Sequence, residues 1–219
     1  MNREKVRKQY EDRKEEIEDR LKDFDQLKEE NDYRLFMELV FVILSSQTEA
    51  QKAWKATEEL DEKNLLMEGN KEQIAKVLER NGVQYEKNKA EYIVKNRKQL
   101  SQPTLSNPTN ELKLKEKLDE ENLDKTRKWL KENISGLGWK GASHFLRNIG
   151  YGDSFAIIST HIVDTMYELD VIGKPELPEN EKQYLEMEEK LQNFSDKIDI
   201  EIKALDLVLW SMKTGEVFK

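Results

Sequence analysis

Apolar residues recur at helical spacing along most of this chain of 219 residues. No stretch alternates between apolar and polar side chains over the length of a β-strand, and no internal repeat is present. The patterns predict helices at about 2–30, 33–46, 71–80, 87–100, 111–119, 122–133, 138–149, 160–170, 180–195 and 198–212, with one more running from Thr48 through Leu60. The predicted fold class is therefore all-α.

The first three of these helices differ in character. Residues 2–30 are almost all charged, with thinly spaced apolar positions, which predicts one long helix with a narrow apolar stripe. Residues 33–46 are far more apolar, so we expect this helix to be buried. Thr48 is the residue type that caps a helix N-terminus, and we expect it to begin the next helix.

Composition excludes several kinds of site. The chain has no cysteine, which rules out disulfides, thiolate zinc sites and a cysteine-ligated iron–sulfur cluster, and two histidines argue against a histidine-rich metal centre. No apolar run reaches the length of a membrane span, and the N-terminus has no signal-peptide core, so we expect a soluble, cytoplasmic protein. A net charge of -8 does not exclude DNA binding, because counterion release depends on the lysines and arginines gathered at the phosphates.

Two predicted helices are joined by the run Gly136-Leu137-Gly138-Trp139-Lys140. Glycines at these spacings permit a positive φ and a close approach of the backbone, and the amides that open the second helix form a phosphate site. Basic residues precede the turn at Lys125, Arg127, Lys128 and Lys131. The turn therefore indicates binding of a DNA backbone at Gly136 and Gly138, or else an ordinary helical hairpin with a glycine cap.

The longer run through Gly141-Ala142-Ser143-His144-Phe145-Leu146-Arg147-Asn148 resembles the helix-hairpin-helix DNA glycosylases, specifically the cysteine-free archaeal-type 8-oxoguanine DNA glycosylase/AP lyases, from about Tyr33 to Lys219. In that family the lysine two places after the second hairpin glycine attacks the sugar C1′, displaces the base and forms a Schiff base. The resemblance implies this role for Lys140. A lysine that is partly desolvated near other cations loses proton affinity and becomes nucleophilic.

The segment Ser159-Thr160-His161-Ile162 departs from the family at one position. The resemblance implies an aspartate that stabilises the cationic sugar, and Ser159 stands in its place. Serine and aspartate both cap helices, so the structural role is expected to survive without the negative charge. The family pattern also implies that His161 lies at the DNA site, whereas a histidine at such a position is otherwise often packed or hydrogen-bonded.

Two more segments carry DNA-binding residues by resemblance. The run Gln84-Tyr85-Glu86-Lys87 matches a family segment whose aromatic residue wedges into the duplex to hold the base extruded, a role that falls on Tyr85, with core packing as the alternative. Gln84 departs from the family arginine, and Lys87 is the basic residue of this group. The run Ser45-Ser46-Gln47-Thr48 resembles the stretch that inserts an amide side chain into the gap, so Gln47 is a candidate for insertion or for helix capping.

The chain ends in Thr214-Gly215-Glu216-Val217-Phe218-Lys219, shortly after Trp210. The resemblance implies that Trp210 lines the pocket for the flipped base and that Lys219 contacts it; core packing of Trp210 is the alternative. Stacking of a base on an aromatic ring is worth about 1–3 kcal/mol.

The resemblance implies a two-lobed helix-hairpin-helix glycosylase fold with the active-site cleft between the lobes. We expect residues 51–150 to form a central lobe with the hairpin, and residues 1–50 together with 151–219 to form the other. No cofactor is implied beyond a structural Na⁺ or K⁺ held by hairpin carbonyls, here those of Glu132, Ile134 and Leu137. The implied partner is double-stranded DNA with a damaged base, bound by a monomer that contacts no membrane.

The implied function is base excision repair by a DNA glycosylase/AP lyase, a hydrolase and lyase that removes 8-oxoguanine through Lys140. Because Ser159 lacks the charge of the family aspartate, two alternatives stay open. One is a glycosylase-like protein that binds damage and cleaves poorly. The other is an AP lyase, or a glycosylase for a different modified base, since pocket contacts set the choice of base.

Overall fold

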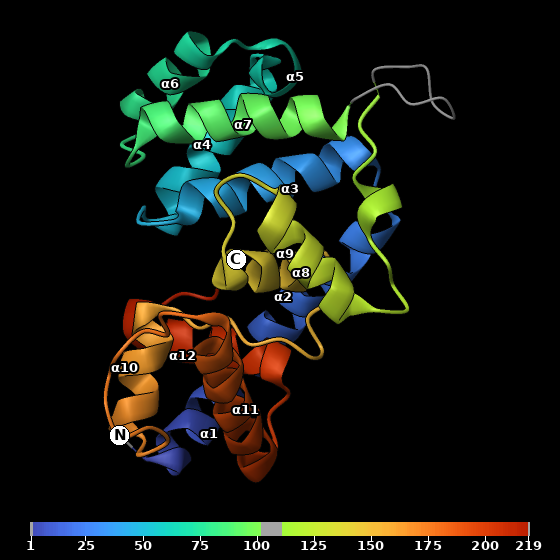
Figure 1. Cartoon of the computed structure of the whole chain (residues 1–219). Coiled ribbons are helices and arrows are strands. Elements are labelled where there is room, and N and C mark those ends of the chain that lie inside the picture. Colours follow the sequence, from blue (N-terminus) through green and yellow to red (C-terminus); the bar gives the residue numbers. More distant parts are fainter. Residues whose placement is uncertain (1, 102–110, 219) are drawn as a thin grey trace. The chain divides into compact units, whose positions relative to one another are not determined.

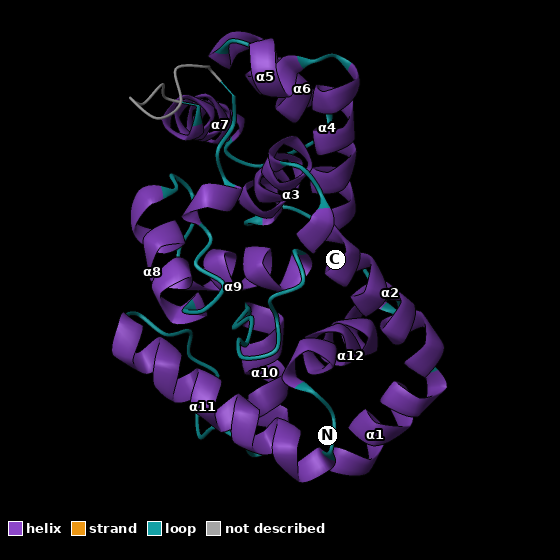
Figure 2. Ribbon diagram, turned by 90° about the vertical axis from the view of Figure 1, so that its right-hand side faces the viewer, coloured by secondary structure: helices purple, strands orange, loops and turns teal. Residues whose placement is uncertain are grey.

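The computed structural model describes residues 2–101 and 111–218, and within them it contains helices and no strand (Figure 2). The all-α prediction is confirmed. The elements in chain order are α1 (Arg3–Asp12), α2 (Lys14–Gln26), η1 (Leu27–Glu29), α3 (Asp32–Ser45), α4 (Ala50–Glu62), α5 (Leu65–Glu68), α6 (Lys71–Arg80), α7 (Glu86–Leu100), η2 (Lys115–Lys117), α8 (Leu123–Asn133), α9 (Trp139–Asn148), α10 (Thr160–Glu168), α11 (Glu181–Ile198) and α12 (Ile202–Thr214). None of the described helices is both long and apolar enough to cross a membrane.

Asparagine side chains begin several of these helices. In each case the side-chain oxygen accepts a hydrogen bond from the backbone N–H three residues on, at Asn2, Asn31, Asn70, Asn122 and Asn180. At Asn70 the side-chain oxygen of Gln73 accepts a hydrogen bond from the Asn70 N–H, which completes a capping box. Each such cap stabilises its helix by about 1 kcal/mol, so the bounds follow from local sequence.

The chain divides into two compact units, one made of residues 1–28 with 146–219 and the other of residues 29–145. The expected division at residues 50 and 150 is therefore corrected, most of all for α3, which belongs to the 29–145 unit. The reason is packing, since α3 lies against α4 and α7 (Figure 1). The second boundary falls inside α9, between Phe145 and Leu146.

Helix α3 is the core of the 29–145 unit. Its ten residues from Leu35 to Leu44 are all buried, which confirms the buried helix predicted from its composition. Phe41 makes edge-on ring contacts with Trp54 of α4 and His144 of α9, and α6 packs along α7.

Helix α12 is the core of the other unit. It packs against α10, α11, α1 and α2, and the residues from Leu205 to Leu209 include four that are almost fully buried: Leu205, Leu207, Val208 and Leu209. The predicted single helix over 2–30 is wrong, because the chain breaks between α1 and α2 at Arg13 (φ -125°, ψ 15°).

Two further local predictions are corrected. Thr48 does not begin α4, whose N-cap is Glu49; its hydroxyl instead accepts hydrogen bonds from the Gln84 N–H and the Lys89 Nζ. The helix expected at 111–119 is reduced to η2, because side chains hold its backbone: Asp32 accepts from the Lys115 N–H and the Thr126 hydroxyl from the Asp119 N–H. The short helix α5 is not foreseen by the pattern.

Candidate active site

The glycine turn joins α8 to α9, as the sequence predicts, and its two glycines differ. Gly136 has φ +91°, and a Cβ there would lie 2.7 Å from Tyr92 Cδ2 and 3.2 Å from Ile43 Cγ2. Gly136 is thus required by both conformation and space. Gly138 has no positive φ, and a Cβ there would meet no atom within 4 Å. Nothing inside the described fold requires a glycine at 138, so the open space at its backbone is available to a ligand.

A buried asparagine holds this turn. The Asn96 Nδ2 donates to the Ser135 carbonyl at 2.9 Å, and the Ser135 N–H donates to the Asn96 Oδ1 at 2.9 Å. Asn96 is fully buried on α7 and its role is not predicted by the sequence reasoning above. A signal was available, because Asn96 sits at helical spacing in the apolar stripe of Ala90, Ile93 and Leu100.

Lys140 is the second residue of α9 and is half-buried. A second lysine lies near it: Lys89 of α7 is only 4% exposed, and burial together with the Lys140 charge lowers its pKa to about 8. The same interaction means that the charges of Lys89 and Lys140 are close together, so the two lysine side chains are neighbours in this part of the unit. A cation is thus present near Lys140 inside one unit, and it is one that the sequence pattern does not predict.

Lys89 also orders the segment between α3 and α4. Its Nζ donates to the Leu44 carbonyl at 2.9 Å, the Ser46 carbonyl at 2.6 Å and the Thr48 hydroxyl at 3.1 Å. Within this segment Gln47 is exposed and has φ +54°. A left-handed conformation costs a non-glycine residue about 1–2 kcal/mol. It also occurs here at Asn64, Asp170 and Asp199, so the conformation alone does not single out Gln47.

Tyr85 has the same unusual conformation, with φ +58°, at the N-cap of α7. Its side chain is 58% exposed, so the core alternative for Tyr85 is wrong. The Gln84 N–H donates to the Thr48 hydroxyl at 3.0 Å, which joins the Tyr85 turn to the Gln47 segment. Gln84 and Lys87 are exposed beside them. The 29–145 unit therefore presents Gln47 and Tyr85 from two linked, strained turns.

The other unit carries Ser159, His161 and Trp210. Ser159 is the N-cap of α10, and its hydroxyl accepts a hydrogen bond from the Ile162 N–H at 3.3 Å, which confirms the predicted capping role. The ring of His161 meets the ring of Trp210 edge-on, with centroids 5.3 Å apart and planes at 72°. His161 is exposed and Trp210 half-buried, so neither is a core residue.

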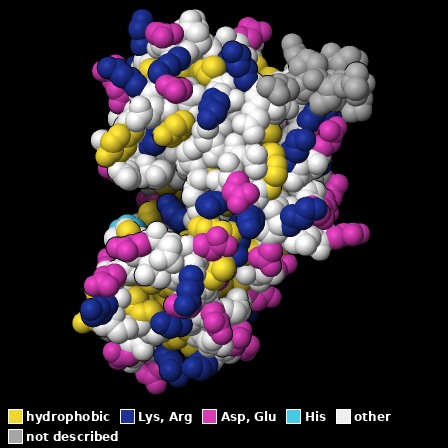
Figure 3. Space-filling view, viewed as in Figure 1, with side chains coloured by type: hydrophobic (Ala, Val, Ile, Leu, Met, Phe, Trp, Pro, Cys, Tyr) yellow, Lys and Arg dark blue, Asp and Glu magenta, His cyan; other side chains and the backbone are white. Residues whose placement is uncertain are grey.

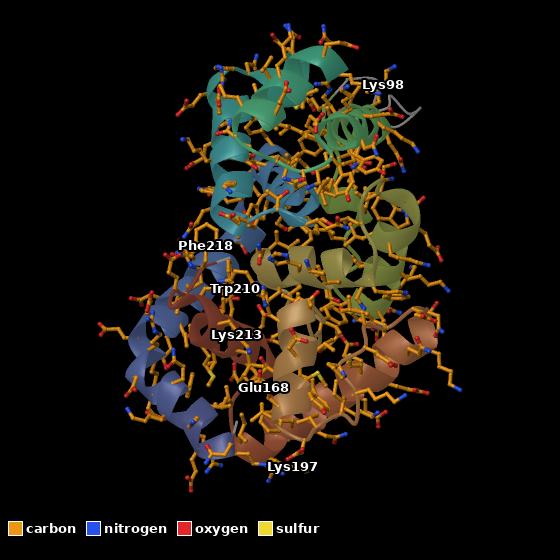
Figure 4. The ribbon with its side chains drawn as sticks, turned by 90° about the vertical axis from the view of Figure 1, so that its left-hand side faces the viewer. Lys98, Glu168, Lys197, Trp210, Lys213 and Phe218 are labelled. Atoms are coloured by element: carbon orange, nitrogen blue, oxygen red, sulfur yellow. The ribbon has the colours of Figure 1, made fainter. Side chains whose placement is uncertain are left out.

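The end of α12 lies close to α10 (Figure 4). Lys213 and Glu168 form an ion pair at 2.9 Å that joins these two helices, and Phe218 follows in the segment after α12. Lys219, predicted to contact the base, lies outside the described residues. On the face drawn in Figure 3, lysine and arginine side chains are interspersed with acidic side chains.

An all-helical chain with a tight glycine turn between two helices, and a lysine at the start of the second, is a helix-hairpin-helix protein. The sequence profile of the 8-oxoguanine DNA glycosylase family matches residues 17–200. The chain belongs to this family.

Two relatives align with this chain along nearly the full length of both partners in each alignment. An 8-oxoguanine DNA glycosylase/AP lyase of Fusobacterium nucleatum is 33% identical over 218 residues, which are 98% of this chain and 96% of the relative. One from Korarchaeum cryptofilum is 34% identical over 203 residues, covering 93% of this chain and 90% of the relative.

Two solved structures have the same fold. The 8-oxoguanine DNA glycosylase of Thermotoga maritima matches with a TM-score of 0.86 at 31% identity, over 99% of this chain and 98% of that one. The Methanocaldococcus jannaschii 8-oxoguanine glycosylase/lyase, in complex with a 15mer DNA containing 8-oxoguanine, matches with a TM-score of 0.82 at 30% identity, over 98% of this chain and 99% of that one.

Proposed function

We propose that this chain is a base excision repair DNA glycosylase/AP lyase that removes 8-oxoguanine from duplex DNA, with Lys140 as the nucleophile. The observation that carries the proposal is the half-buried lysine in the first turn of α9, directly after the glycine turn, in a chain of this family. Relatives bearing the same activity in their names, from a bacterium and an archaeon, support it. We expect a monomer that acts in the cytoplasm.

The chemistry needs an uncharged amine. The lone pair of the Lys140 nitrogen forms a bond to the sugar C1′, and the glycosidic C–N bond breaks, so that the base leaves with the electron pair and takes up a proton. Loss of a proton from the nitrogen and opening of the sugar ring give the Schiff base. Removal of a C2′ proton then expels the 3′ phosphate by β-elimination. The first step would take place beside a second lysine, Lys89, whose charge interacts with that of Lys140.

Under this proposal, some residues contact the sugar-phosphate backbone of the DNA and others enter its base stack. The exposed amides at Gly136 and Gly138 would contact phosphate, with Gln84 and Lys87 as further contacts to the strand. The exposed side chains of Gln47 and Tyr85 would enter the duplex and fill the space left by the extruded base.

The flipped base would stack on Trp210, with His161 edge-on to that ring and Lys219 as a polar contact. A half-buried indole supported by a neighbouring ring leaves a face for a base, and such stacking is worth about 1–3 kcal/mol.

A monovalent cation fits the hairpin by donor type. The proposed ligands are the carbonyls of Glu132, Ile134 and Leu137. The Ile134 carbonyl accepts one hydrogen bond, from the Leu137 N–H at 3.2 Å, and keeps a second lone pair. Rings of such carbonyls are known ligands of K⁺, which here would stiffen the turn.

The test is covalent trapping. The protein is incubated with duplexes carrying 8-oxoguanine or a preformed abasic site in the presence of borohydride, which reduces the Schiff base to a stable adduct. We expect adducts on both duplexes, absent in Lys140→Gln and retained in Lys76→Gln, an exposed lysine of α6 with the same change of charge. The proposal would be overturned if neither of the two duplexes gave an adduct that depends on Lys140.

A second candidate function is recognition of damage with impaired catalysis. It is favoured by Ser159, whose neutral hydroxyl is engaged with the Ile162 N–H and supplies no negative charge. An electrostatic stabiliser in the transition state is worth about 10²–10³ in rate. If Ser159→Asp raises the single-turnover rate by that factor, the native chain is limited by the missing charge. If the native chain is already active and the substitution changes nothing, this second candidate fails.

A further inference from the structure

The N-terminal helices hold the C-terminal helix. Both α1 and α2 pack against α12, and Val6 and Ile17, one from each, are fully buried (Figure 2). The family profile begins only at residue 17, so α1 lies outside the matched region. The sequence gives α1 no role in the chemistry.

The break between α1 and α2 places one side chain at the end of α12. Arg13 Nη2 donates to the Gly215 carbonyl at 2.5 Å, and its Nη1 donates to Glu16 Oε2 at 2.8 Å. The side chain is only 29% exposed. An arginine that spans a carboxylate and a carbonyl is held in a fixed orientation, because the guanidinium presents its donors as a planar fork.

Gly215 is the residue at which the chain leaves the helix. It is the C-cap of α12, with φ +83°, and Glu216, Val217 and Phe218 follow it. The Thr214 hydroxyl bonds the Trp210 carbonyl at 3.0 Å, and Val217 is buried. A cation at a helix C-terminus is also favoured by the helix dipole. The Thr214 hydroxyl also accepts a hydrogen bond from the Glu216 N–H at 3.3 Å, so Arg13 and Thr214 both contact the point at which the chain leaves α12.

We propose that Arg13 is a positioning residue for base recognition, which acts by holding the Gly215 carbonyl and so aiming the C-terminal segment. The inference rests on the proposed function, which places Trp210 of α12 at the flipped base, and the Thr214 hydroxyl next to Gly215 donates to the Trp210 carbonyl. Strand cleavage at an abasic site needs no base contact. Arg13 therefore matters for excision of 8-oxoguanine and not for the lyase step.

The test compares two single-turnover rates in each variant: release of 8-oxoguanine from a duplex, and cleavage of a duplex with a preformed abasic site. Arg13→Met keeps the length of the side chain and removes its donors. We expect base release to fall about tenfold to a hundredfold, the effect of a small misplacement of a binding group, while abasic cleavage changes less than about twofold. Arg13→Lys keeps the charge and one contact, and is expected to lie between wild type and Arg13→Met.

The matched control is Arg7→Met. Arg7 lies on α1 and also binds a main-chain carbonyl of its own unit, since its Nε donates to Ile198 at the end of α11 at 3.1 Å. We expect it to leave the ratio of the two rates at the wild-type value. The inference would be overturned if the ratio of base release to abasic cleavage in Arg13→Met equals that of the wild type, including the case in which both rates fall equally. If Arg13→Met does not fold, Arg13→Lys decides by the same ratio. A wild-type chain that cleaves neither duplex overturns the proposed function instead.

Discussion

Two single alanine substitutions, at Gly136 and at Gly138, separate the role of the hairpin turn in folding from its role in DNA binding. Gly136→Ala adds a methyl group where φ is +91° and where Tyr92 and Ile43 leave no room, at 2.7 and 3.2 Å. Gly138→Ala adds the same group two residues away, where no atom lies within 4 Å. The two variants therefore have the same change of composition and opposite expected effects.

The magnitude follows from two costs at Gly136. A left-handed alanine costs about 1–2 kcal/mol, and overpacking against fixed side chains costs about 1–3 kcal/mol. Together these give a loss of roughly 2–5 kcal/mol, which lowers the melting temperature of a chain of this size by about 5–15 °C. Gly138→Ala is expected to stay within about 0.5 kcal/mol of wild type, as for an unobstructed surface site.

The assays are thermal unfolding followed by circular dichroism and binding of duplex DNA in a Lys140→Gln background. We expect Gly136→Ala to melt early. We expect Gly138→Ala to have the melting temperature of the wild type and to bind DNA more weakly, because its methyl group would occupy the space through which a phosphate approaches the amides. Equal melting temperatures for the two variants would refute the steric reasoning, and unchanged DNA affinity in Gly138→Ala would refute the assignment of Gly138 to binding.

Three further predictions concern neighbouring residues. Asn96→Leu leaves both main-chain groups of Ser135 without the partners that Asn96 supplies and should cost about 2–4 kcal/mol in urea unfolding. Lys89 has its pKa lowered to about 8, so the unfolded state binds more protons between pH 8 and its ordinary value of 10.5. Stability should therefore rise with pH across that window, by up to about 3 kcal/mol, and Lys89→Met should abolish the rise when unfolding is measured from pH 7 to 10. Trp210→Ala should slow release of 8-oxoguanine about 5- to 160-fold and spare abasic cleavage.

The features that sequence predicts well here are those set by neighbours in the chain. Helix α6 begins at a capping box and ends before an Asn-Gly turn, so its bounds are as expected. Ser159 caps α10 because the bond to the Ile162 N–H spans only three residues. Gly136 takes a positive φ because the turn between two helices needs one residue that tolerates it.

The features that sequence does not predict depend on distant partners. The break at Arg13 leaves no mark in the charged pattern of residues 2–30, because its partner, Gly215, is 202 residues away. Asn96 and Ser135 are 39 residues apart in the sequence, and Lys89 is 45 residues from Leu44, to whose carbonyl it donates. Each of these side chains is polar and sits where a local pattern calls for an apolar or solvated residue, so only the folded arrangement gives it a partner.

Lys89 and Lys140, which are neighbours in the 29–145 unit, differ in what they can contact. Lys89 is too deeply buried to reach a phosphate, and its three oxygen partners use all the donors of its ammonium group. Its charge therefore acts only within the protein, on the order of the Gln47 segment and on Lys140. Lys140 is half-buried and keeps access to a substrate. Under the proposed function, a cation that orders the site and an amine that reacts are separate requirements, and two different lysines of one unit would meet them.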